Sequence, residues 1–196
     1  MSTATVKTKN KLRTLDMVYV SMFSALMMIG ANITSFIPFM TIGGVPITLQ
    51  TFFAVLAGAF LGSRLGAISM AVYMFIGLAG APVFAKFMGG PTQILSSTFG
   101  FILSFIVTAY VTGKIIEKSN KLHSYIIAAL IGTLLSYLIG TNLMYLAYKV
   151  WVQAPAAFSY KVAWMWMAVP FPKDIFLAVL AGMFAHRMQN IVKRSR

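Results

Sequence analysis

The chain has 196 residues, of which 59% are hydrophobic and 10% are charged, and its mean hydropathy is +0.84. A soluble domain carries far more charge, so this composition excludes a soluble globular protein and predicts an integral membrane protein. The net charge of +13 comes without interleaved aromatic residues, which favours a role in membrane topology and lipid contact over nucleic-acid binding. The chain has no cysteine, which excludes disulfides and cysteine nucleophiles.

Six hydrophobic segments follow one another, each near the roughly 20 residues that a helix needs to cross a bilayer. The predicted fold is an all-α integral membrane protein with six transmembrane helices. A basic tail at 1–16, a helical bundle at 17–187 and a second basic tail at 188–196 make up the predicted organisation. The six segments cover about residues 17–38, 46–63, 65–85, 93–113, 122–148 and 164–186.

Basic residues at the segment ends predict the orientation of the bundle. An even number of crossings places both termini on one side of the membrane. Twelve of the 16 Lys and Arg residues would lie on that side, and Lys86, Lys149, Lys161 and Lys173 would lie on the other. Because basic residues are concentrated in cytoplasmic loops, both termini are predicted to be cytoplasmic and the protein to lie in the cytoplasmic membrane.

Polar side chains from five segments are expected to form one layer in the outer third of the membrane. A helix rises about 1.5 Å per residue, so Asp174, thirteen residues before Arg187, lies about 20 Å above the cytoplasmic boundary of a core about 30 Å thick. This layer predicts a pocket open to the outside. The alternative is that these residues are hydrogen-bonding contacts between helices, as in any bundle. The same count gives about 21 to 24 Å for Gln50, Thr48, Thr98, Asn32 and Tyr137.

Asp174 is one of only three acidic residues in the chain. Pro170 and Pro172 exclude a regular helix before Lys173, so the last helix is expected to begin near Asp174, below the membrane surface. One interpretation is purely structural: an acid in the first turn of a helix stabilises that turn. An acid about 10 Å inside a membrane, however, usually marks a ligand or ion site. Both interpretations remain open at this point.

The sequence lacks the patterns of a catalytic or metal site. His123 and His186 are far apart, the three acids are scattered, and no phosphate-binding loop motif occurs. The chain is therefore predicted to be neither an enzyme nor a metalloprotein, to need no cofactor, and not to hydrolyse ATP by itself.

The stretch VPITLQTFFAVLAGAFLGSRLGAISMAVYMFIGLAGAPVFA, residues 45–85, resembles the BioY family, the biotin-specific substrate-binding subunits of energy-coupling factor transporters. The blocks VP-x-TLQT, LAG-x-x-LG-x-R-x-GA and G-x-PVFA are similar to the family pattern, and weaker similarity extends over most of the chain. PFPKDIFLAVLA resembles a family block that ends Pro-Gly-Asp-x-x-Lys. The chain departs from the family at three places. Leu177 replaces the basic residue three positions after the acid, Met88 stands where Arg is frequent, and residues 96–101, SSTFGF, replace the family's G-P-T-G-G-Y.

The resemblance implies a six-helix subunit that captures biotin from outside. It also implies partners: a transmembrane coupling subunit and two cytoplasmic ATPases. Ser21 and Ala25 form a small-xxx-small pair, which is similar to the family's contact with the coupling subunit. Packing inside this bundle is the alternative for that pair.

The resemblance also suggests roles for individual residues. Asp174 would accept a hydrogen bond from a ureido N–H of biotin, and Gln50 and Thr48 would complete the polar contacts. Lys86 or Lys173 would neutralise the carboxylate of the valerate chain. The aromatic residues expected against the apolar part of the ligand are Tyr73, Phe52 and Phe87.

Three alternatives to a biotin subunit stay open from the sequence. One is a proton-coupled carrier in which Asp174 titrates, and a second is a binding subunit for a different vitamin. The third, a membrane enzyme or scaffold, has less support because the chemistry-bearing residues are missing.

Overall fold

Helices make up most of the computed structural model, which describes residues 12–36, 41–42 and 45–194. Short 3-10 helices and two strands of two residues each connect them near one end of the molecule. The α-helices in the described residues are α1 (Thr14–Asn32), α2 (Gln50–Leu61), α3 (Ser63–Leu78), α4 (Phe99–Ile116), α5 (Leu122–Val150), α6 (Tyr160–Ala168) and α7 (Phe171–Arg194). The connecting elements are η1 (Ile33–Phe36), β1 (Thr41–Ile42), β2 (Val45–Pro46), η2 (Ala85–Phe87) and η3 (Pro91–Leu95).

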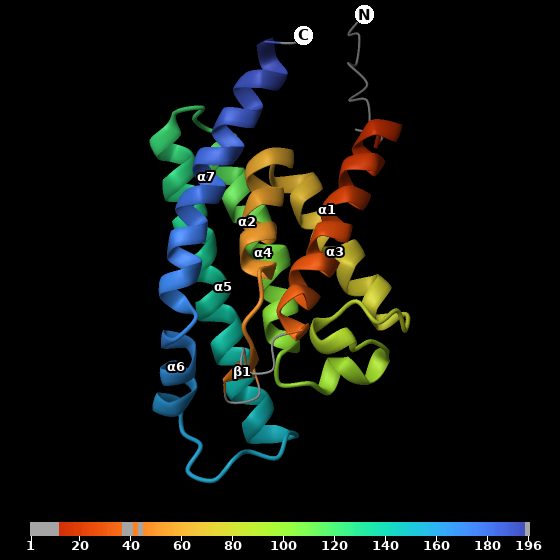
Figure 1. Ribbon diagram of the computed structural model, residues 1–196, viewed down its shortest axis with the longest axis vertical. Helices are drawn as coiled ribbons and strands as arrows, with labels where there is room; N and C mark the ends of the chain where they lie inside the picture. The colour runs from red at the N-terminus through yellow and green to blue at the C-terminus, as the bar shows by residue number, and fades with distance from the viewer. Residues whose placement is uncertain (1–11, 37–40, 43–44, 195–196) are drawn as a thin grey trace, which may run out of the picture.

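The long helices form a bundle with α2 near its centre (Figure 1). Helix α2 packs against α1, α3, α4, α5 and α7, while α4 and α5 lie side by side. Helix α1 begins and α7 ends at the same end of the bundle, at the top of Figure 1. The β1–β2 hairpin, the η2–η3 loop and α6 lie at the opposite end.

The all-helical class predicted from the sequence is confirmed, but the count of six crossings does not follow from helix length. Helices α1, α4 and α5 are long and apolar enough to cross a membrane, and α6 with α7 forms a bent pair that could be a fourth crossing. Helices α2 and α3 are shorter, with 12 and 16 residues. The predicted second, third and fourth segments were too long because each includes apolar loop residues, and hydropathy alone does not separate these from helix.

The start of the last helix differs from the prediction. Pro170 and Pro172 were expected to exclude helix before Lys173, yet α6 ends at Ala168 and α7 begins at Phe171. Proline is tolerated in a first helical turn because the N–H it lacks would have no partner within the helix. The two helices meet at an angle of 53°. Asp174 therefore lies in the first turn of α7, and the helix continues through residues predicted to form the C-terminal tail.

Small residues allow α2, α3 and α4 to pack closely. A Cβ atom added at Gly58 would lie 2.2 Å from the carbonyl oxygen of Ala109, and one added at Gly113 would lie 2.2 Å from the backbone nitrogen of Ser63. Both glycines are needed because the backbones of neighbouring helices approach so closely. Contacts of this kind are typical of helix packing in membranes.

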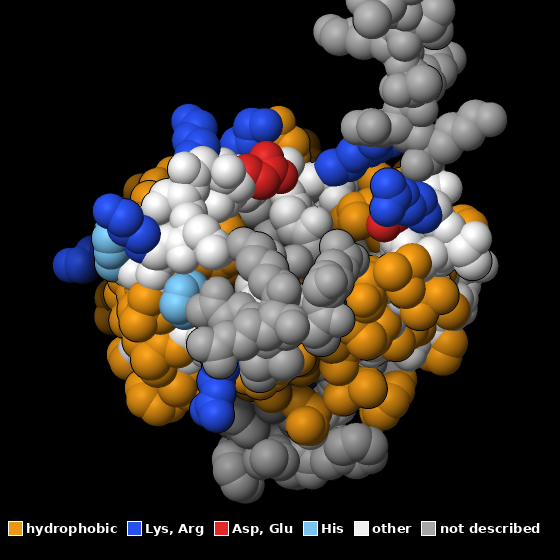
Figure 2. Space-filling model, turned by 90° about the horizontal axis from the view of Figure 1, so that it is seen from above, with side chains coloured by type: hydrophobic (Ala, Val, Ile, Leu, Met, Phe, Trp, Pro, Cys, Tyr) orange, Lys and Arg blue, Asp and Glu red, His pale blue; other side chains and the backbone are white. Residues whose placement is uncertain are grey.

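The surface separates into a basic end and hydrophobic flanks. Figure 2 looks onto the end where α1 begins and α7 ends, and Lys and Arg side chains gather along its edge. Large hydrophobic side chains such as Phe75, Leu138 and Phe176 are exposed on the sides of the bundle. Hydrophobic flanks below a basic rim are expected of a bundle that faces lipid.

Candidate functional site

A pocket of about 250 Å³ opens at the end of the bundle opposite the basic rim. It lies between the loop before α2, the η2–η3 loop, the first turns of α4 and α7, and the middle of α5. Small-molecule sites combine an apolar wall with a few placed polar groups, and this pocket does so. Its polar lining residues are Thr48, Gln50, Thr51, Lys86, Gln93, Ser96, Ser97, Thr98, Tyr137 and Asp174. Its apolar lining residues are Val45, Pro46, Ile47, Phe84, Ala85, Met88, Phe101, Ile102, Phe105, Met167 and Pro170.

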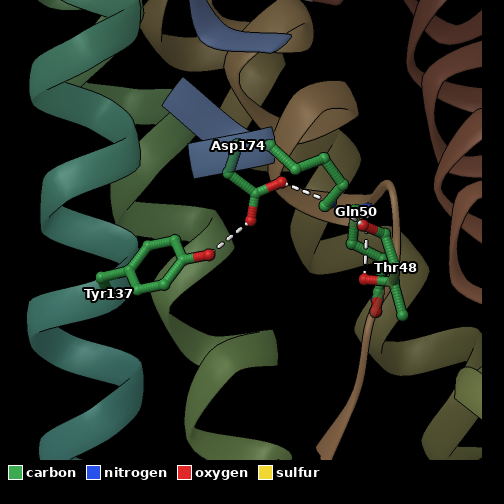
Figure 3. Close-up of polar contacts among 5 residues, drawn as sticks. Thr48, Gln50, Tyr137 and Asp174 are labelled. Carbon is green, nitrogen blue, oxygen red and sulfur yellow. Dashed lines mark hydrogen bonds and ion pairs between the residues drawn. The ribbon is translucent and has the colours of Figure 1, made fainter. Parts of the chain in front are cut away.

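Asp174 is the buried acid of this pocket, with 6% of its surface exposed. Its Oδ2 atom accepts a hydrogen bond of 2.6 Å from the hydroxyl of Tyr137. Its Oδ1 atom lies 2.5 Å from the Nζ atom of Lys173. Figure 3 shows the carboxylate between Tyr137 and the segment that carries Thr48 and Gln50. A buried carboxylate needs such partners, because desolvation of an unpaired charge is costly.

Helix α7 and the loop before α2 are joined through Lys173. Its Nζ atom also donates a hydrogen bond of 2.7 Å to the carbonyl oxygen of Thr48. Two residues further on, Gln50 is the first residue of α2, and its Nε2 atom donates to the hydroxyl of Tyr73 at 2.9 Å. One polar side of the pocket is therefore built from α5, α7 and the residues at the start of α2.

The loop between α3 and α4 covers another side of the pocket. Lys86 and Phe87 have φ angles of 62° and 55°, in the left-handed region that disfavours side chains. The backbone nitrogen of Lys86 donates to the hydroxyl of Ser35 at 3.1 Å, and that of Phe87 donates to the Oδ1 atom of Asn32 at 2.8 Å. These bonds fix the strained turn and place the exposed side chain of Lys86 at the pocket mouth.

The structure brings together most of the polar residues expected in the site. Within the predicted polar layer, Asn32 does not line the pocket: its amide supports the loop through Val83 and Phe87. The residues of the predicted set that line the pocket are Asp174, Gln50, Thr48, Thr98, Tyr137 and Lys86.

The three aromatic residues expected against the ligand lie outside the pocket lining. Tyr73 is fully buried behind Gln50, and Phe52 packs against Phe53 at a ring distance of 5.1 Å and against the core. Phe87 is exposed. Phe101 and Phe105 of α4, which were not among the predicted site residues, line the cavity instead. The height of a residue along the membrane normal, counted from the helical rise, does not tell which side of the helix faces a cavity.

Loop residues were the other omission. Gln93, Ser96 and Ser97 line the pocket beside Thr98. The run of polar residues just before an apolar helix was a usable signal. The depth estimated from the rise per helical residue does not apply to a loop, however, so only Thr98 was predicted as a site residue.

Ser21 and Ala25 are both exposed on α1, so they do not pack inside this bundle. The inward side of the same helix carries Ser24, whose hydroxyl donates to the carbonyl oxygen of Ser69 at 2.8 Å. The small-xxx-small pair is therefore available on the outer surface of the bundle.

The pocket chemistry suits a small molecule that is apolar along most of its length. One end would present hydrogen-bond donors to Asp174, and the other would present a negative charge near Lys86. Among the residues that the structure describes, no group of three or more His, Cys, Asp or Glu could hold a metal ion.

Comparisons with known proteins agree with this architecture. The family model described as BioY family matches residues 4–194. The protein named putative biotin transporter BioYB of Bacillus subtilis (strain 168) is 46% identical over 190 residues, which cover 95% of this chain and 94% of the relative. The probable biotin transporter BioY of Lysinibacillus sphaericus is 36% identical over 186 residues, 93% of this chain and 91% of the relative.

A solved structure shares the fold. The crystal structure of the S-component for biotin from an ECF-type ABC transporter matches with a TM-score of 0.75 at 21% sequence identity. The match covers 93% of this chain and 94% of that chain. With the family model and two relatives matching nearly the whole length, the chain belongs to the BioY family.

Proposed function

We propose that this chain is the biotin-binding S-component of an energy-coupling factor transporter and serves biotin uptake across the cytoplasmic membrane. The observation that carries the proposal is the buried carboxylate of Asp174 in a pocket whose remaining walls are largely apolar. Membership of the BioY family and the names of the relatives, both biotin transporters, support biotin as the ligand.

The chemistry of biotin matches the polar groups of the pocket. Its ureido ring has two N–H donors and one carbonyl acceptor. A carboxylate has about four lone-pair positions, and Tyr137 and Lys173 use two of those on Asp174. The others are available for the ureido N–H groups, and bonds of this charge-assisted kind are the strong ones. Gln50 and Thr48 complete the polar contacts.

The rest of biotin is an apolar ring and a valerate chain that ends in a carboxylate. Phe101 and Phe105 provide the apolar wall. Lys86 at the pocket mouth neutralises the valerate carboxylate, because the ammonium of Lys173 is already engaged with Asp174 and Thr48.

The proposal includes six membrane crossings with both termini in the cytoplasm. The start of α1, the end of α7 and the basic rim share one end of the bundle (Figures 1 and 2). The pocket is lined by elements of the other end. A transmembrane coupling subunit contacts the exposed Ser21–Ala25 face of α1, and two cytoplasmic ATPases supply the energy for uptake.

The proposed ligand role of Asp174 is tested by biotin binding to the purified full chain. Replacing Asp174 by Asn keeps its size but removes its charge, and we expect about tenfold to a hundredfold weaker binding. Asp16→Asn is the matched control, since Asp16 lies in the first turn of α1 at the other end of the bundle. Equal affinities for wild type and Asp174→Asn would reject the assignment.

An uptake experiment tests whether the protein works with a coupling subunit and two ATPases. Uptake of labelled biotin should require co-expression of a coupling subunit with intact ATPases and should stop when ATP hydrolysis is blocked. Uptake by the chain alone that collapses with the proton gradient would instead indicate a proton-coupled carrier.

A further inference from the structure

We infer that Lys173 is a positioning residue: it orients the Asp174 carboxylate and the loop before α2, and it does not contact the carboxylate of the ligand. The part of this inference that concerns ligand affinity rests on the proposed function. The part that concerns Asp174 can be tested without any ligand.

The ammonium group of Lys173 has two close acceptors within the protein. The Nζ atom of Lys173 is 2.5 Å from Asp174 Oδ1 and 2.7 Å from the carbonyl oxygen of Thr48. A lysine ammonium has three donors, so two of them are used within the protein. Asp174 and Thr48 line the pocket, whereas Lys173 does not. Lys173 thus lies behind the pocket wall and joins Asp174 to Thr48, which is 125 positions before Lys173 in the sequence.

These contacts fix the Asp174 carboxylate and the loop before α2 in place. Tyr137 from α5 binds the other carboxylate oxygen of Asp174. The carboxylate is therefore set by contacts to α5 and, through Lys173, to the loop before α2. That loop leads directly into Gln50, whose backbone nitrogen lies 3.4 Å from the hydroxyl oxygen of Thr48. Loss of the ammonium would release the loop and leave a buried carboxylate with a single neutral donor.

Lys173 and Lys86 have different roles, and two ligands can distinguish them. Lys86 is exposed and lines the pocket, and the contacts of the Asp174 carboxylate described above are made by Tyr137 and Lys173 instead. A cation that pairs with the ligand carboxylate should distinguish biotin from its uncharged methyl ester. A residue that orients Asp174 should affect both ligands equally, because both carry the same ureido ring.

The binding experiment compares biotin and biotin methyl ester on the purified full chain. We expect Lys173→Gln to weaken both ligands by a similar factor of about ten or more, while the ratio of the two affinities stays at its wild-type value. Lys86→Gln should weaken biotin alone. Lys173→Arg should recover part of the affinity, because its guanidinium can still donate to a carboxylate and a carbonyl. Selective weakening of biotin by Lys173→Gln would overturn the inference.

A ligand-free experiment keeps the inference separate from the proposed function. Melting temperatures in detergent are compared for Lys173→Gln, Asp174→Asn and the double variant. Because the double variant removes the buried charge together with its partner, we expect it to melt above Lys173→Gln alone, yet without recovery of biotin binding. Should Lys173→Gln fail to fold, recovery of folding in the double variant is the corresponding result. A double variant no more stable than Lys173→Gln would overturn the inference. If wild type binds neither ligand, the proposed function fails, while this comparison still decides the role of Lys173.

Discussion

The environment of Asp174 shows how a buried charge is accommodated in a bundle that is otherwise poor in charge. The Tyr137 hydroxyl binds one carboxylate oxygen at 2.6 Å, while its ring packs edge-on against Phe171 at 5.2 Å. The hydroxyl and the ring therefore have separate roles that one substitution can distinguish. Removing the hydroxyl weakens the polar network around the acid but leaves the aromatic packing in place.

We expect Tyr137→Phe to lower the free energy of unfolding by about 1.5–3 kcal/mol, the range for a hydrogen bond to a charged group. Biotin binding should weaken too, because Asp174 loses one of its two fixed contacts. Tyr125→Phe is the control: its hydroxyl donates to the neutral Asn120 at 3.0 Å, near the basic end. That change should cost about 1 kcal/mol and leave binding unaltered. Denaturant unfolding in detergent and a binding titration measure both quantities.

At the scale of the elements, Glu117 joins the ends of two helices near the basic end of the bundle. It follows the last residue of α4, and its Oε1 atom accepts bonds from the hydroxyl and the backbone N–H of Ser63, the first residue of α3, at 2.6 and 2.8 Å. It thus caps the start of α3 from a neighbouring helix. The Ser63 hydroxyl and N–H, with Lys114, hold the pKa of Glu117 below its ordinary value of 4.5, although partial burial opposes the shift.

The cap should make stability depend on pH in a defined direction. Because the folded pKa lies below the unfolded one, the contribution of Glu117 is complete above about pH 5 and is lost as the pH falls through the folded value. Glu117→Gln should lower the unfolding free energy by about 1 kcal/mol near pH 7, and below about pH 5 it should make the melting temperature less dependent on pH. Lys114→Gln, which removes only an exposed ion pair of 3.4 Å, should change stability less. Parallel pH curves for wild type and Glu117→Gln would contradict this role.

At the scale of the whole molecule, the bundle has one basic end and one end with the ligand pocket. In the part of the chain that the structure describes, Lys118 follows α4 at the basic end, and Ala154 lies in the exposed connection between α5 and α6 at the pocket end (Figure 1). The two positions should face opposite sides of the membrane if the proposed orientation is correct.

The absence of cysteine makes this orientation directly testable. In intact cells, a thiol reagent that does not cross membranes should label Ala154→Cys and leave Lys118→Cys unlabelled, because only the pocket end faces outward. After the cells are permeabilised, both variants should react, which controls for thiol accessibility. Labelling of Lys118→Cys in intact cells would reverse the orientation.

Composition and hydropathy were sufficient to predict the helical membrane class, and family motifs were sufficient to indicate the BioY family. Depth counting brought Asp174, Gln50 and Tyr137 into one layer because helical rise is a local property of the chain. Direction around a helix axis and the path of a loop depend on packing with distant segments. For that reason Tyr73 and Asn32, which were predicted site residues, lie outside the pocket lining, whereas Phe101 and Ser96 line it without having been predicted.

The sequence by itself determined the helical membrane class of this protein, because a helix that crosses lipid requires a long apolar segment. It also singled out Asp174, the acid that is buried in the pocket. Only the tertiary structure decided that Lys173 turns back onto its neighbour and reaches Thr48, and that α6 and α7 meet at a bend of 53°. These features join residues far apart in the chain, and contacts between distant segments are set by how the whole bundle packs.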